Sequence, residues 1–142
     1  MKKAGSKAIF TTVDFDIPVW LAKTAEKNKI NKLLIISSVG ANAKSNNFYL
    51  ATKGKMEQAV SEYRIPNIYF FRPSMLLGER NENRFSEKLT QKIMKATGFL
   101  MLGKLKKYKS IPASIVAKSM QTVAKRNYTK YFFESDELWE LQ

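Results

Sequence analysis

The feature that most constrains the fold is a short, uninterrupted apolar run, KLLIISSV, at residues 32–39. The run is short for a helix and lacks the alternation of a half-exposed strand, so it predicts a strand that is buried on both faces. A second run, IYFFR at residues 68–72, has the same character and is stopped by Pro73. Because strands of this kind occur mainly in parallel sheets covered by helices, the two runs predict an α/β protein.

Segments with helical periodicity alternate with these strands. The first covers residues 14–29, where we expect Asp16 to be the N-cap and Pro18 to lie in the first turn. We interpret Asp14 and Asp16 as part of this helix start rather than as a catalytic pair. Further helices are predicted at 46–63, 84–97, 114–126 and 135–141, and a third strand at 130–133. This order predicts right-handed crossovers and a doubly wound parallel sheet of about three strands with flanking helices.

Composition excludes several classes of site. The 142 residues include no cysteine and no histidine, which excludes disulfides, thiolate nucleophiles and the usual base of a catalytic triad. We predict no metal site. No apolar run is long enough to span a bilayer and no signal peptide is recognisable, so we expect a cytoplasmic protein.

The net charge of +13, from 25 basic and 12 acidic side chains, favours binding to polyanions at low salt. Nucleic acid is therefore one partner to consider. The lysines are spread along the chain rather than confined to one block, which favours a generally lysine-rich surface.

The stretch that indicates chemistry is SSVG at residues 37–40, followed by YLATK at residues 49–53. Tyr49 and Lys53 are four residues apart on a predicted helix, so their side chains share one face. A phenol is a poor acid or base at neutral pH, and a neighbouring ammonium favours its ionised form. A serine at the end of the preceding strand, where α/β sheets place their binding crevice, can hold a carbonyl or alcohol beside the phenol.

Taken alone, the Tyr-x-x-x-Lys spacing is weak, since a buried aromatic residue beside a lysine whose stem lies along apolar surface gives the same pattern. The order of motifs is more specific: a strand, Ser-Ser-x-Gly, Tyr-x-x-x-Lys on the next helix, and a strand that ends in Arg-Pro. In this order the chain resembles the short-chain dehydrogenase/reductase superfamily. Within it, the chain is most similar to the atypical branch that contains bacterial NAD(P)-binding oxidoreductases related to the human Tat-interacting protein of thirty kilodaltons. The matching segments are residues 2–6, 13–16, 37–57, 71–80, 103–113 and 134–138.

The resemblance implies a role for each matching residue. Tyr49 would be the catalytic acid/base, Lys53 its ribose-binding partner, and Ser38 the serine that orients the carbonyl. Ser37, together with the segment of Arg72, Pro73 and Ser74, would lie along the cofactor, NAD or NADP. The nicotinamide of such a cofactor carries out the redox step.

The family's glycine-rich turn, which binds the pyrophosphate, is missing from this sequence. The resemblance therefore implies that residues 1–142 form a single domain, the C-terminal portion of an NAD(P)-binding Rossmann-like domain, and we expect a truncated chain. Without a preceding strand, residues 32–39 would form an open sheet edge, which favours a homodimer or a complementing N-terminal fragment.

Two functions follow as expectations. The first is an NAD(P)-dependent oxidoreductase or epimerase-like domain of the atypical short-chain type, not competent as an enzyme alone. The alternative is a non-enzymatic interaction module that binds a protein or a polyanion through its basic face or open sheet edge.

Overall fold

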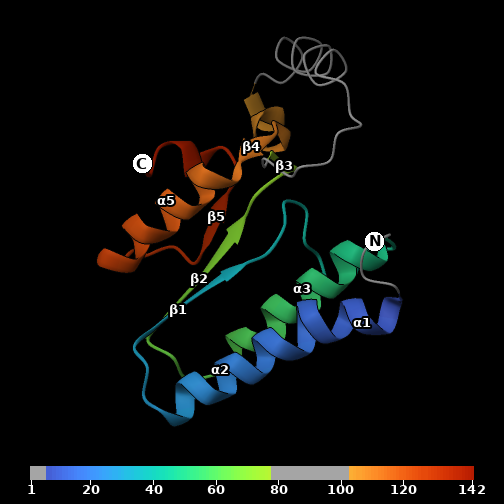
Figure 1. Ribbon diagram of the computed structural model, residues 1–142, viewed down its shortest axis with the longest axis vertical. Coiled ribbons are helices and arrows are strands. Elements are labelled where there is room, and N and C mark those ends of the chain that lie inside the picture. Colours follow the sequence, from blue (N-terminus) through green and yellow to red (C-terminus); the bar gives the residue numbers. More distant parts are fainter. Residues whose placement is uncertain (1–5, 78–102) are drawn as a thin grey trace.

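The computed structural model describes residues 6–77 and 103–142. Its centre is a parallel three-stranded sheet with the strand order β1-β2-β5 (Figure 1). The strands are β1 (Lys32–Ile36), β2 (Asn67–Arg72) and β5 (Phe132–Glu134). The predicted α/β class, with a partial doubly wound parallel sheet, is therefore confirmed. The predicted helix at 84–97 lies outside the described residues.

The described part of the chain begins with one long helical run on one side of the sheet (Figure 1). It consists of α1 (Lys7–Thr11), a π-helical turn η1 (Thr12–Asp16) and α2 (Ile17–Lys27). Ser6 is the N-cap, because its hydroxyl oxygen accepts a hydrogen bond from the Ile9 amide at 3.2 Å.

The prediction that Asp16 is an N-cap was wrong. Asp16 has helical backbone angles and its side chain makes no capping hydrogen bond. The amide of Ile17 instead donates to the carbonyl of Thr12, one residue further back than in an α-helix. This wider turn lies directly before Pro18, which has no amide hydrogen to donate, and the helix continues through the proline.

Helices cover both faces of the sheet. On one face lie α2 and α3 (Phe48–Ser61), and on the other lies α5 (Ala113–Lys125) (Figure 1). The core between α2, α3 and the sheet consists of Ala22, Ala25, Leu33, Ile35, Met56, Val60, Ile65, Ile68 and Phe70. The core on the α5 side consists of Tyr69, Phe71, Ile111, Val116, Val123, Phe133 and Leu138. Successive residues of β2 therefore alternate between two cores, which explains its continuous apolar sequence.

The end of α5 is fixed to the first strand of the sheet. Lys32 Nζ donates hydrogen bonds to the carbonyls of Val123, Ala124 and Arg126 at 3.2, 2.8 and 2.7 Å. A cation at this position satisfies carbonyls that have no partner within the helix and interacts favourably with the helix dipole.

Short elements complete the described part of the chain. A two-stranded parallel sheet, which the sequence did not indicate, joins β3 (Leu76–Leu77) to β4 (Ile111–Pro112). The predicted terminal helix is a single 3-10 turn, η3 (Glu137–Trp139), and another 3-10 turn, η2, covers Gly103–Tyr108. Among the described residues, no helix has the length and apolar character that crossing a membrane requires.

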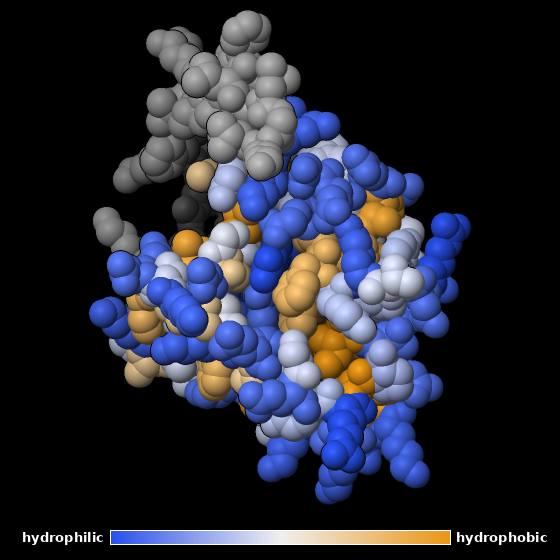
Figure 2. Space-filling model, turned by 180° about the vertical axis from the view of Figure 1, so that it is seen from behind, coloured by the Kyte–Doolittle hydropathy of each residue, from blue (hydrophilic) through white to orange (hydrophobic). Residues whose placement is uncertain are grey.

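Hydrophobic surface remains exposed at several places, and Figure 2 shows an apolar strip between hydrophilic side chains on the side opposite to the view of Figure 1. A half-open pocket of about 290 Å³ is lined by Ser61, Tyr63, Ile65, Pro66, Ile68, Phe70, Tyr131 and Phe132. β1 forms one edge of the sheet, and Ile36 at its end is 42% exposed.

Candidate functional site

The candidate site lies where the three parallel strands end. Because the strands are parallel, their carboxyl ends meet at one edge of the sheet. Ser37 and Ser38 follow β1, Pro73 and Ser74 follow β2, and Ser135 follows β5.

Hydrogen bonds continue from β1 into the segment after it. The Ser37 amide donates to the Phe71 carbonyl at 2.6 Å, and the Val39 amide donates to the Pro73 carbonyl at 3.0 Å. The backbone that carries both serines is therefore held against β2.

Lys53 reaches this edge from α3. Its Nζ donates to the carbonyl of Ile36, the last residue of β1, at 3.1 Å. It also forms an ion pair with Asp14 Oδ1 at 2.7 Å, and the Lys53 side chain is only 9% exposed. An almost completely buried ammonium is thus placed at the end of β1.

Tyr49 lies one turn before Lys53 on α3. Its ring is half-buried and packs against Phe10 of α1, with ring centroids 5.5 Å apart. Phe10 also packs against Phe48 at 5.7 Å. Within the described ranges, the Tyr49 hydroxyl makes no hydrogen bond to another side chain or to the backbone, so the ring is held by aromatic packing.

The two serines differ in their hydrogen bonding. Ser37 is 3% exposed, and its Oγ has no hydrogen-bond partner among the described residues. The Ser38 hydroxyl is also buried and makes one long bond, 3.4 Å, to the carbonyl of Val39. Because a buried hydroxyl normally has a partner, Ser37 is the kind of group that a bound molecule would satisfy.

Two glycines allow the loop between β1 and α3 to fold over the site. Gly40 has φ +78°, in the left-handed region that glycine adopts without strain. A Cβ on Gly54 would lie 2.2 Å from the Ala43 amide nitrogen and 2.3 Å from the carbonyl carbon of Asn42. Gly54 directly follows Lys53, so the loop approaches α3 closely beside the lysine.

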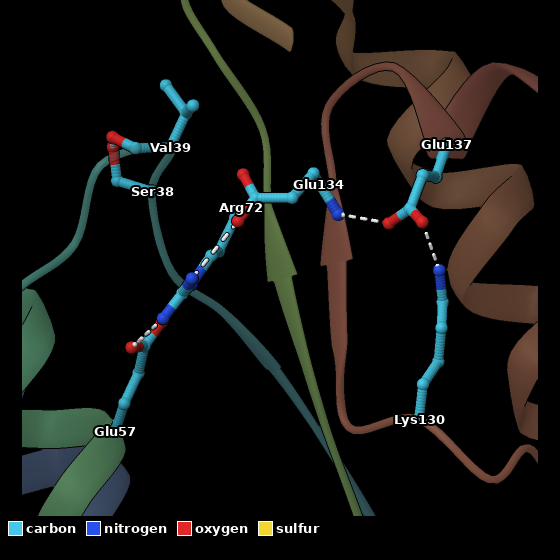
Figure 3. A network of polar contacts seen from close by, with 7 residues as sticks. All are labelled: Ser38, Val39, Glu57, Arg72, Lys130, Glu134 and Glu137. Carbon is cyan, nitrogen blue, oxygen red and sulfur yellow. Dashed lines mark hydrogen bonds and ion pairs between the residues drawn. The ribbon is translucent and has the colours of Figure 1, made fainter. Parts of the chain in front are cut away.

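Arg72 is engaged in ion pairs, and Figure 3 shows it between Glu57 and Glu134. Its Nε and Nη2 donate to the two carboxylate oxygens of Glu57 at 2.9 and 2.7 Å, and its Nη1 donates to Glu134 Oε1 at 3.0 Å. The hydrogen bond to Glu57 is the main cause that raises the pKa of Arg72 above its ordinary value, against the effect of burial. This Glu57–Arg72–Glu134 cluster joins α3, β2 and β5.

The other predicted cofactor-binding residues lie at the end of β2. Pro73 is buried, and its carbonyl accepts the bond from Val39 described above. The Ser74 hydroxyl donates to the carbonyl of Lys109 and accepts a hydrogen bond from Ser135 at 3.3 Å. The structure therefore brings Ser37, Ser38 and Lys53 to one strand end, while the Arg72 and Ser74 side chains hold neighbouring segments together.

Sequence reasoning missed Asp14 as a partner of Lys53. It lies far from Lys53 along the chain, and the pattern around it indicated a helix start. The acidic partners of Arg72 were missed for the same reason, since no local spacing connects Glu57 or Glu134 to it.

Two neighbouring pockets lie beside the site. The roomier of the two, about 620 Å³, is lined by Ala41, Asn42, Ala43, Gly54, Glu57, Gln58, Ser61, Glu62, Arg72 and Phe132. Neither this pocket nor the apolar one is lined by Ser38, Tyr49 or Lys53. Among the residues that the structure describes, no group of acidic side chains could hold a metal ion.

Comparison with known proteins gives partial matches. No protein-family model matches the chain. The chain is 40% identical over 81 residues to the protein FMP52, mitochondrial, of Lodderomyces elongisporus, and this match covers 57% of the chain and 34% of the relative. It is 32% identical over 109 residues to the protein of the same name from Debaryomyces hansenii, covering 77% of the chain and 47% of the relative. It is 35% identical over 91 residues to the protein HTATIP2 of Rattus norvegicus, covering 64% of the chain and 37% of the relative.

These relatives overturn one expectation. The prediction of a cytoplasmic protein was wrong, because the relatives from both yeasts are named as mitochondrial proteins. The chain spans between 34% and 47% of the length of these three relatives, and it is similar over that part to FMP52 and HTATIP2.

Proposed function

We propose that this chain carries the reaction centre of an NAD(P)-dependent oxidoreductase or epimerase-like domain of the atypical short-chain dehydrogenase/reductase type. The observation that carries the proposal is the Lys53 ammonium at the end of β1, beside the Ser-Ser segment and one turn after Tyr49. The likeness to FMP52 and HTATIP2 supports the same family, and we extend the mitochondrial location of the yeast relatives to this chain.

The residues present fit part of a dinucleotide site. The unpartnered Ser37 Oγ and the Lys53 ammonium are donors that could hold the nicotinamide half, which supplies the hydride chemistry when bound. The Arg72 guanidinium does not fit this role, because Glu57 and Glu134 already occupy it. We therefore propose that the segment of Arg72, Pro73 and Ser74 contributes its backbone.

In this proposal the residues of the centre share the proton transfer. The Ser38 hydroxyl holds the oxygen of the reacting carbonyl or alcohol. Tyr49 transfers the proton to or from that oxygen, and the Lys53 ammonium stabilises the phenolate that remains. The ring of Phe10 keeps the phenol in place.

The sequence contains no glycine-rich turn for the pyrophosphate. We propose that the pyrophosphate is bound outside residues 1–142, and that the chain pairs with a second copy or with a complementing polypeptide. The exposed edge of β1 is the place for this pairing.

Titration of the purified chain with NADPH and NADH, followed by nicotinamide fluorescence, tests the proposal. We expect binding that is lost in Lys53→Ala and retained in the control Lys55→Ala, because Lys55 is exposed on the same helix. Tyr49→Phe should retain binding and lose turnover. Absence of binding at millimolar cofactor, in the chain and in its assemblies, would contradict the proposal.

A second function is supported by one observation, the net charge of +13. A non-enzymatic module would bind a polyanion or an acidic protein through its basic face, on which Lys106 and Lys109 are exposed. Binding to heparin that weakens steeply with salt and is unchanged in Tyr49→Phe would favour this function.

A further inference from the structure

We propose that Asp14 is a positioning residue of the proposed reaction centre, holding the Lys53 ammonium at the end of β1. The inference depends on the proposed function for its chemical meaning, but the contact itself does not. Asp14 Oδ1 lies 2.7 Å from Lys53 Nζ, and the carboxylate side chain is 23% exposed against 9% for the lysine.

The hydrogen-bond capacity of the ammonium determines what remains for a ligand. A lysine ammonium has three N–H donors. One is directed to Asp14 and one to the carbonyl of Ile36, so two acceptors from two different elements fix the nitrogen. Among the residues that the structure describes, no acceptor takes the remaining N–H, which is available to a hydroxyl of a bound molecule.

The helical run that carries Asp14 holds both members of the Tyr49–Lys53 pair. Phe10 packs on the ring of Tyr49, and Asp14, four residues later, pairs with Lys53, four residues after Tyr49. Over one turn, two residues of the first helical run therefore contact two residues of α3 with the same spacing. Asp14 lies inside the π-helical turn, and such turns often occur at functional sites.

The same two residues could also form an ion pair at the surface, but losing such a pair would have a small effect. Exposed pairs contribute little, because water solvates both charges. Lys53 is almost fully buried, so removing Asp14 would leave an ammonium without a counter-charge and with one acceptor fewer. Its nitrogen would then move toward water and away from the strand end.

The experiment observes the ammonium directly by ¹H–¹⁵N NMR of lysine side chains, in which buried, hydrogen-bonded NH₃⁺ groups exchange slowly enough to give signals. Lys53→Arg assigns the Lys53 signal by its loss. We expect the signal in the wild-type chain, its loss in Asp14→Asn, and its recovery in Asp14→Glu, which restores the charge. The control Asp16→Asn changes an exposed carboxylate in the same π turn and should keep the signal.

Cofactor titration of the same variants gives the second readout. If the wild-type chain binds NADPH, Asp14→Asn should weaken binding roughly tenfold, which corresponds to about 1.4 kcal/mol, and Asp14→Glu should recover part of it. An unchanged Lys53 signal in Asp14→Asn, or unchanged NADPH affinity in a binding-competent chain, would overturn the inference. If Asp14→Asn unfolds, as judged by circular dichroism, a folded Asp14→Glu chain that lacks the signal would also overturn it.

The two proposals fail in different ways. A wild-type chain whose Lys53 signal depends on Asp14 but which binds neither NADPH nor NADH would contradict the proposed function and support the positioning of Lys53 by Asp14.

Discussion

Gly54 is a residue whose identity is explained by packing next to the site. It stands in the middle of α3, where glycine costs roughly 1 kcal/mol relative to alanine in an isolated helix. Its position is explained by the loop after β1, whose backbone at Asn42 and Ala43 lies where a side chain would be. Helix propensity therefore favours alanine at this position, whereas the packing of the loop favours glycine. The structure indicates that packing is the stronger constraint.

We predict that Gly54→Ala destabilises the chain by about 1–3 kcal/mol, although alanine is the better helix former. The methyl group would contact rigid backbone rather than a flexible side chain, so the loop has to move. Urea denaturation measures the free energy of unfolding. The control Gln58→Ala, on an exposed position one turn later, should change it by less than about 0.5 kcal/mol. An increase in stability for Gly54→Ala would show that the loop does not pack this closely.

How far the site could be predicted from sequence depends on how its residues are linked. Tyr49 and Lys53 were found because both lie on one helix at a fixed spacing, and the serines because they follow an apolar strand. The unpartnered Ser37 Oγ and the Asp14–Lys53 pair were not, since the first depends on what surrounds the end of β1 and the second on how η1 packs against α3. Whether these residues act in catalysis stays a prediction.

At the scale of elements, the Glu57–Arg72–Glu134 cluster links α3 to the last two strands of the sheet (Figure 3). The two carboxylates are not equivalent. Both oxygens of Glu57 accept from Arg72, whereas Glu134 Oε2 is buried without a partner among the described residues. The Glu57 side chain is 6% exposed and that of Glu134 is 25% exposed.

This difference predicts the effect of removing each charge. Glu57→Gln should cost about 2–4 kcal/mol, because it leaves the guanidinium with one hydrogen-bond acceptor fewer in a mostly buried place. Glu134→Gln should cost only about 1 kcal/mol, because the amide NH2 can replace the oxygen that has no partner while the remaining oxygen still accepts from Arg72. Thermal or urea unfolding compares the two variants, and equal losses would contradict the proposed asymmetry.

The helices and strands were predicted correctly where a single hydrophobic pattern dominates the segment. The apolar runs located β1 and β2 to within a few residues, and periodicity located α3 and α5. The start of the first helix was missed because Asp16 followed by Pro18 is typical of an N-terminus, whereas the structure continues through both with a π turn. β3 and β4 have two residues each, too few for any periodicity.

At the scale of the whole molecule, exposed apolar surface and high positive charge act against each other. The outer face of the first helical run exposes Ile9, Val13, Ile17, Trp20 and Leu21, and β1 is an edge strand of the sheet that the described residues form. Such surface favours association. A net charge of +13 on each chain opposes self-association most strongly at low ionic strength, where repulsion is least screened.

We therefore predict that the chain self-associates and that the associated fraction increases with salt, as sedimentation velocity can measure. Binding to an added polyanion would show the opposite dependence, because salt weakens phosphate contacts. Ile36→Lys should reduce association if the edge of β1 forms the contact, since a charge on an edge strand blocks strand pairing. The control Met75→Lys adds the same charge at a residue that is 72% exposed outside this edge, and should have the smaller effect. A monomer at every salt concentration would contradict assembly through β1.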